Sequence, residues 1–138
     1  MIRCLAHGVL VSFKAPFTQV VKALESVSPA SNVYLEVVET KPRVAVAVGE
    51  KYFLRAGNYL VATTIVLEGE NETLVKIVAS GGRRSLLDLG DLEASKDYAR
   101  LVFEELARIL DVEHTIISEV NYLEKSRSEA LYFKVTSK

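Results

Sequence analysis

Residues 58–80 decide the fold, and they read Asn58-Tyr-Leu-Val-Ala-Thr-Thr-Ile-Val-Leu-Glu-Gly-Glu-Asn-Glu-Thr-Leu-Val-Lys-Ile-Val-Ala-Ser80. Two runs rich in β-branched residues, 59–67 and 73–79, flank a short acidic turn that holds Gly69 and Asn71. Runs of this kind on either side of a turn of this composition indicate a β-hairpin. We therefore expect this hairpin to lie at the centre of an antiparallel sheet.

The segments around the hairpin predict the rest of the sheet and two helices. Short β-rich segments separated by polar turns, including turns at 41–42 and 49–51, precede it, as in a meander. They span residues 3–13, 33–40, 43–48 and 52–55. Pro16 begins a short amphipathic helix that ends near Val27, and residues 92–110 form a long one. The expected fold is α+β: an antiparallel meander sheet of about six strands packed against a short N-terminal helix and a long C-terminal helix.

The last part of the chain is a C-terminal extension, residues 112–138, of a single domain that spans residues 1–138. Within it, residues 114–120 fit either a strand or a continuation of the helix. Residues 130–135 alternate as a strand does, and such a strand can pair with a sheet edge or with another subunit.

Composition narrows the classes of partner. The net charge of −1 gives no electrostatic reason to expect nucleic acid. No apolar run reaches the ~20 residues of a membrane-spanning helix, so we expect no membrane partner. Cys4 is the single cysteine, which excludes an internal disulfide and favours a cytoplasmic location.

The sequence contains no signature of catalysis or of metal binding. Cys4 and His7 are three residues apart, which places them on opposite faces of a strand, and His114 is the second of the two histidines. We therefore expect no metal, no cofactor and no catalytic residue. The segment Ser80-Gly-Gly-Arg-Arg-Ser85 offers flexible backbone and two guanidinium groups, which suit an anion. The alternative interpretation is that this segment only connects a strand to a helix and that its arginines are exposed to solvent. The candidate anion-binding residues are Gly81, Gly82, Arg83 and Arg84.

A second candidate site is an apolar space between the sheet and the long helix. Hydroxyl groups at its mouth would orient a small, partly apolar ligand. The candidate ligand-binding residues are Tyr34, Tyr59, Thr63 and Tyr98. The alternative is that the tyrosines are half buried at the margins of the sheet, with their hydroxyl groups in water.

The order of strand, helix, meander and long C-terminal helix over residues 3–110 resembles the helix-grip architecture of the START and Bet v 1-like superfamily. That resemblance implies a curved sheet wrapped around the last helix. One departure is that the superfamily usually has two short helices after its first strand, whereas residues 16–27 have room for one. Residues 78–82, 89–90 and 94–98 are also similar to a small prokaryotic family without an assigned activity. Likeness of fold alone assigns no function.

Three functions remain open. The first is non-catalytic binding of a small, partly apolar ligand between the sheet and the long helix. The second is self-association as a homo-oligomer, because several strands are apolar on both faces and two helices cannot cover both. Either a second copy of the chain or the C-terminal extension would then cover the remaining apolar surface. The third is an enzyme or binding protein for an anionic substrate at residues 81–84.

Overall fold

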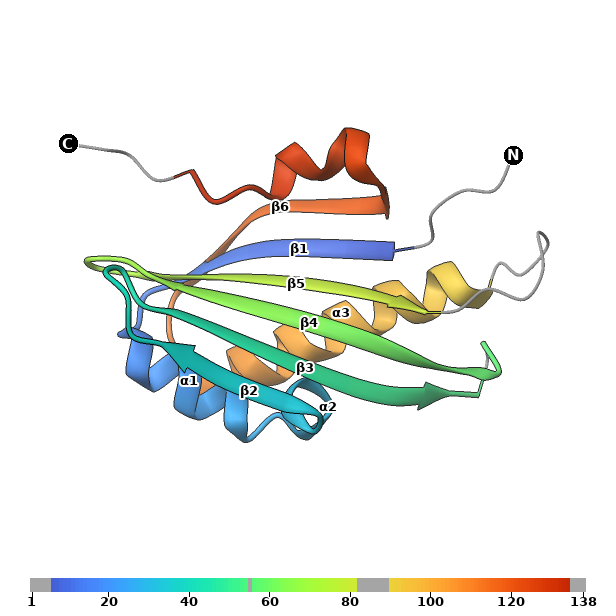
Figure 1. Cartoon of the computed structure of the whole chain (residues 1–138), viewed down its shortest axis with the longest axis horizontal. Coiled ribbons are helices and arrows are strands. Elements are labelled where there is room, and N and C mark those ends of the chain that lie inside the picture. The colour runs from blue at the N-terminus through green and yellow to red at the C-terminus, as the bar shows by residue number, and fades with distance from the viewer. Residues whose placement is uncertain (1–5, 55, 82–89, 135–138) are drawn as a thin grey trace.

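One antiparallel sheet with helices packed on it forms the chain, so the expected α+β class is confirmed (Figure 1). The structure is a computed structural model that describes residues 6–54, 56–81 and 90–134. The strands are β1 (Ala6–Phe13), β2 (Tyr34–Val38), β3 (Val44–Phe53), β4 (Asn58–Glu68), β5 (Thr73–Gly81) and β6 (His114–Leu123). The helices are α1 (Phe17–Glu25), α2 (Ser28–Ser31), α3 (Gly90–Leu110) and the 3₁₀ helix η1 (Lys125–Leu131).

The predicted hairpin is present as β4 and β5, which pair from Glu68 opposite Thr73 to Leu60 opposite Gly81. In the described residues the sheet order is β2-β3-β4-β5-β1-β6. The run from β2 to β5 is the expected meander. β1 is inserted between β5 and β6, and its last residue, Phe13, is paired with strands on both sides. A simple meander therefore accounts for only part of the sheet.

The prediction of a turn at residues 49–51 was wrong, because β3 runs without interruption from Val44 to Phe53. Gly49 lies inside this strand, where α2 packs directly on it. A Cβ atom at this position would lie 1.8 Å from the carbonyl oxygen of Pro29. The glycine is there for close packing against a second short helix, which the sequence reasoning did not expect.

The prediction of a strand at residues 130–135 was also wrong for its described part. Residues 125–131 form η1 instead, and residues 132–134 belong to no strand. Of the two predictions for residues 114–120, the strand is confirmed, because residues 114–123 form β6. Leu131 at the end of η1 packs on Leu10 and Val120, which holds the segment against the sheet. Ser118 Oγ donates a hydrogen bond to the carbonyl oxygen of Ala130 at 2.6 Å.

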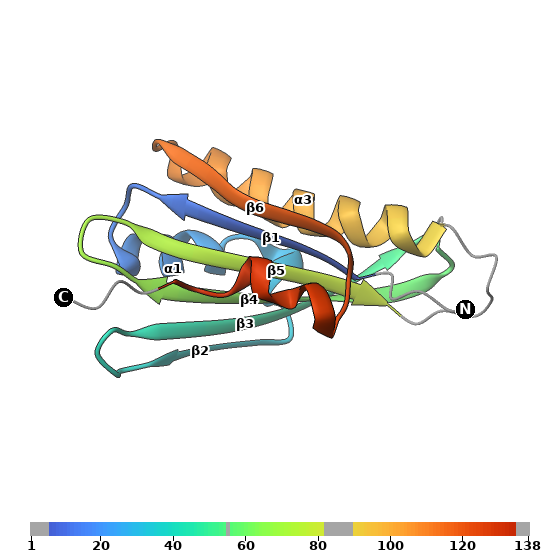
Figure 2. The ribbon, with the colours of Figure 1, turned by 90° about the horizontal axis from the view of Figure 1, so that it is seen from above.

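The two faces of the sheet are covered differently (Figure 2). The inner face packs against α1, α2 and α3 in one continuous core, where alternate residues of β4 and β5 are buried. The outer face carries the opposite residues, and η1 lies over its β6 and β1 part. Every residue of β1 is buried because both of its faces are covered. Among the described helices none combines the length and the apolar character needed to cross a lipid bilayer.

Candidate functional site

The outer face of β2, β3 and β4 carries large apolar side chains that no described element covers. η1 lies on the same outer face but near its opposite edge, against β6 and β1 (Figure 1). Tyr59 is 61% exposed, Tyr34 49% and Tyr52 46%. The same face carries the exposed carboxylates of Glu36 and Glu50. Its other residues are mainly aliphatic: Val38, Val44, Val46, Val48, Val61, Thr63, Ile65 and Leu67. We call this set, with the three tyrosines, the outer patch.

The outer patch is ordered at one end by an aromatic pair. Tyr52 and Tyr59 are directly opposite each other on β3 and β4, with ring centroids 5.1 Å apart and an interplanar angle of 70°. Edge-to-face contacts of this kind stabilise neighbouring strands by about 0.5–1.5 kcal/mol beyond the area they bury. Such rings also keep a fixed orientation, which suits them to contact another molecule.

The four candidate ligand residues do not line one space. Tyr34, Tyr59 and Thr63 lie on the outer face, the first on β2 and the other two on β4. Tyr98 lies on α3 in the core of the inner face, fully buried, and its hydroxyl group donates a hydrogen bond to the carbonyl oxygen of Pro29. Burial raises the pKa of Tyr98. Binding of an apolar ligand between the sheet and α3 stays a prediction of the sequence.

The candidate anion loop lies largely outside the described residues. Gly81 is the last residue of β5 and lies against the side chain of Leu60, whose Cγ atom would be 2.6 Å from an added Cβ. Gly82, Arg83 and Arg84 fall in the undescribed segment 82–89. The anion site therefore also stays a prediction.

Both histidines have partners inside the fold. The ring of His114 packs on those of Phe13 and Phe103, with centroid distances of 5.6 and 5.3 Å. His7 is fully buried. Cys4 lies outside the described residues. Across residues 6–54, 56–81 and 90–134, no three of the His, Cys, Asp or Glu side chains gather as ligands of a metal ion would.

His7 belongs to a polar cluster that links β1, β6 and α3. Its Nε2 atom lies 2.6 Å from Oε2 of Glu119, and the guanidinium group of Arg100 donates to the same carboxylate, with Nε 2.9 Å from Oε2. Burial raises the pKa of Glu119, but the hydrogen bonds from Arg100 and His7 outweigh it, so the net shift is downward. Arg100 lies on α3, 19 residues before Glu119 in the chain. No local pattern connects it with residues so distant along the chain.

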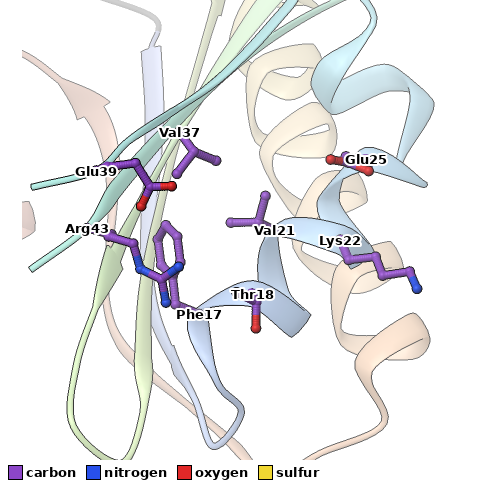
Figure 3. A pocket seen from close by; sticks show the side chains of 8 residues that line it. All are labelled: Phe17, Thr18, Val21, Lys22, Glu25, Val37, Glu39 and Arg43. Carbon is purple, nitrogen blue, oxygen red and sulfur yellow. The ribbon is translucent and has the colours of Figure 1, made fainter.

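A groove of about 370 Å³ lies between α1 and the edge of the sheet (Figure 3). Its floor is apolar and its rim is charged. Phe17, Thr18, Val21, Lys22 and Glu25 line it from α1, and Val37, Glu39 and Arg43 line it from the sheet side. The guanidinium group of Arg43 stacks on the ring of Phe17, with Cζ 4.8 Å from the ring centroid. It also forms an ion pair with Glu68, in which Nη2 lies 2.8 Å from Oε2.

Neither a known protein family nor a curated protein matches this chain. Among solved structures, the chain is similar to an uncharacterized protein from Bacillus thuringiensis. The match has 11% sequence identity and a TM-score of 0.41, and it covers 75% of this chain and 98% of that chain. A likeness of this degree carries no argument about function.

Proposed function

We propose that the chain is a self-associating interaction domain, which forms a reversible homodimer by packing the outer patch of one copy on that of another. The supporting observation is the exposed apolar face of β2, β3 and β4, with three tyrosines between about half and two thirds exposed. The largest exposed apolar patch of a folded chain is often functional, and contact with another protein is one such function. Sheet faces pack in this way in β-sandwiches, about 10 Å apart.

The chemistry of the outer patch suits a second copy of the same chain. In a dimer with a two-fold axis, the outer patch of one copy packs on the outer patch of the other, so the patch must be complementary to itself. The central residues Val46, Val48, Thr63 and Ile65 carry no charge. Two copies therefore meet there without burying like charges against each other. Glu36 and Glu50 point to the same face, Glu36 on β2 opposite Val46 and Glu50 on β3 between Val48 and Tyr52. The dimer must therefore leave both carboxylates in contact with water, as at the polar positions of other interfaces.

The size of the outer patch indicates a weak dimer. Three strands at a spacing of ~4.8 Å and with a mean length of ~30 Å present roughly 430 Å² per copy, or roughly 900 Å² in the dimer. Stable interfaces bury about 1,200–2,000 Å² in total, and reversible ones are smaller. We therefore expect a dissociation constant on the order of 10 μM, which corresponds to about −7 kcal/mol.

Sedimentation equilibrium between about 1 and 300 μM protein tests this proposal, with Val61→Lys as the variant. Val61 is 39% exposed on β4 and lies opposite Glu50, so the new ammonium group has a carboxylate across the strand and the monomer stays folded. Each dimer contains the change twice. Burial of the exposed part of a valine contributes about 0.6–1.2 kcal/mol, so losing two such contributions weakens the dimer at least about tenfold.

The matched control is Thr115→Lys, which makes the same charge change on an exposed residue of β6, away from the outer patch. We expect this variant to dimerise as the wild type does. A wild-type chain that stays monomeric at 300 μM would end the proposal. Equal dimerisation of Val61→Lys and Thr115→Lys would show that any dimer uses another surface.

A further inference from the structure

The free edge of β2 is a second surface, distinct from the outer patch. β2 pairs with β3 on one side, and in the described residues no strand pairs with its other side. The backbone N–H and C=O groups on that side are available to another extended chain, which is how strand addition to a sheet begins. β2 is only five residues long, so such a partner would pair over a short segment.

The groove beside this edge would receive side chains of an added strand. In a strand, successive side chains point to opposite faces. A chain paired with β2 therefore directs every second side chain toward the inner face, where Phe17, Val21 and Val37 form the apolar floor of the groove (Figure 3). The volume of about 370 Å³ is in the range of ligand sites, ~300–1,000 Å³. The edge of β2 can therefore hydrogen-bond the main chain of a partner, while the groove accommodates its side chains.

The charge around the edge selects the partner. Glu25 and Glu39 lie on the rim of the groove, and Glu36 points to the opposite face of β2. All three carboxylates belong to exposed residues. The charge of Arg43 is neutralised by Glu68, so among the residues that line the groove Lys22 is the cation that offsets these carboxylates. An acidic edge with an apolar groove favours a segment that combines basic and apolar side chains.

A second copy of this chain does not suit the edge. Glu36 is the middle residue of β2, so two copies of β2 paired antiparallel about a two-fold axis place Glu36 opposite itself. Like charges directly opposite each other in a sheet are destabilising. We infer that β2 and the adjoining groove bind an extended basic peptide segment of another protein by strand addition, with its apolar side chains in the groove.

The probe is a fluorescein-labelled heptapeptide of alternating lysine and valine, and fluorescence anisotropy measures its binding to the full chain. We expect the double variant Glu36→Lys/Glu39→Lys to weaken binding at least about tenfold, because two attractive charges become repulsive. The matched control Glu124→Lys/Glu129→Lys makes the same change of net charge at exposed residues near η1 and should bind as the wild type does.

N-methylation of the probe distinguishes strand addition from simple charge attraction. Alternate amides of an added strand point toward β2 or away from it. Methylating the amides of one parity should therefore abolish binding, whereas methylating the other parity should leave it nearly unchanged. A glutamate–valine heptapeptide should not bind.

The inference is overturned if the lysine–valine peptide shows no binding at 1 mM chain. It is also overturned if both methylated forms bind alike, if the glutamate–valine peptide binds equally, or if the two double variants weaken binding by the same factor. Peptide binding does not depend on the homodimer. The variant Val61→Lys, in which the proposed dimer is weakened, keeps β2 and the groove unchanged and should bind the peptide as the wild type does.

Discussion

Replacing Gly49 by alanine should destabilise the fold strongly, because the added methyl group collides with the backbone of α2. The new Cβ atom would lie 1.8 Å from the carbonyl oxygen of Pro29 and 2.7 Å from Cα of Ala30. Real Cβ contacts essentially never fall below 3.0 Å, so the oxygen must move by at least 1.2 Å, the difference between 3.0 and 1.8. Both contacted atoms belong to the backbone of α2, so the helix itself must be displaced.

The cost of this displacement follows from the contacts of α2. The Pro29 carbonyl oxygen accepts the hydrogen bond of the buried Tyr98 hydroxyl group, and Ala30 is fully buried. A buried donor left without its acceptor costs about 1–3 kcal/mol, and forcing extra volume into a packed core costs about another 1–3 kcal/mol. We expect Gly49→Ala to lower the free energy of unfolding by about 2–6 kcal/mol, a large part of the ~5–15 kcal/mol of a typical domain.

Urea denaturation followed by circular dichroism measures this change, and Gly57→Ala serves as the control. Gly57 has φ of 66°, and an added Cβ atom there meets nothing within 4 Å. That variant suffers only the conformational penalty of a left-handed residue, about 1–2 kcal/mol. If Gly49→Ala were within 1 kcal/mol of the wild type, or less damaging than Gly57→Ala, the close packing of α2 on β3 would be refuted.

Three further variants probe the contacts that join the elements. The pKa of Glu119 is lowered in the fold, so its contribution to stability is present above about pH 4.5 and is lost as the pH falls below that value. Glu119→Gln should therefore lower the urea midpoint most near pH 7, because His7 loses its carboxylate partner. The difference in midpoint between wild type and variant should narrow toward pH 3; a difference that does not change with pH would contradict this. Leu131→Ala should cost about 2–4 kcal/mol in urea denaturation if η1 is truly docked on the sheet, and a loss below 0.5 kcal/mol would show that it is not. Tyr98→Phe should cost about 1–2 kcal/mol in thermal unfolding, because the Pro29 carbonyl oxygen loses its donor; an unchanged midpoint would rule out that hydrogen bond.

Local patterns predicted the elements that are stabilised locally. The hairpin of β4 and β5 was readable because alternating side chains and a short polar turn lie in one continuous stretch. The long helix was readable from its apolar stripe, which includes Val102 and Leu106. The turn at residues 49–51 was predicted wrongly because glycine occurs both in turns and at close contacts. Only the position of α2, which the local sequence does not reveal, distinguishes the two at Gly49.

Contacts between distant residues were not predictable in the same way. The approach of His7, Arg100 and Glu119 depends on β6 returning beside β1, which no neighbouring residue signals. The sequence did indicate that both faces of the strands are apolar. It did not indicate that η1 covers only the β6 and β1 part, which leaves Tyr34 and Tyr59 exposed on the rest.

The placement of β1 has a consequence for how the chain is made. Phe13 pairs with Thr73 on one side and with His114 on the other, so an early strand waits for partners that are synthesised much later. Closing such long loops before any contact is gained slows folding. A nascent chain emerging from the ribosome therefore exposes Val9 and Val11 until β5 and β6 have both been synthesised, and chaperones have a long opportunity to bind there.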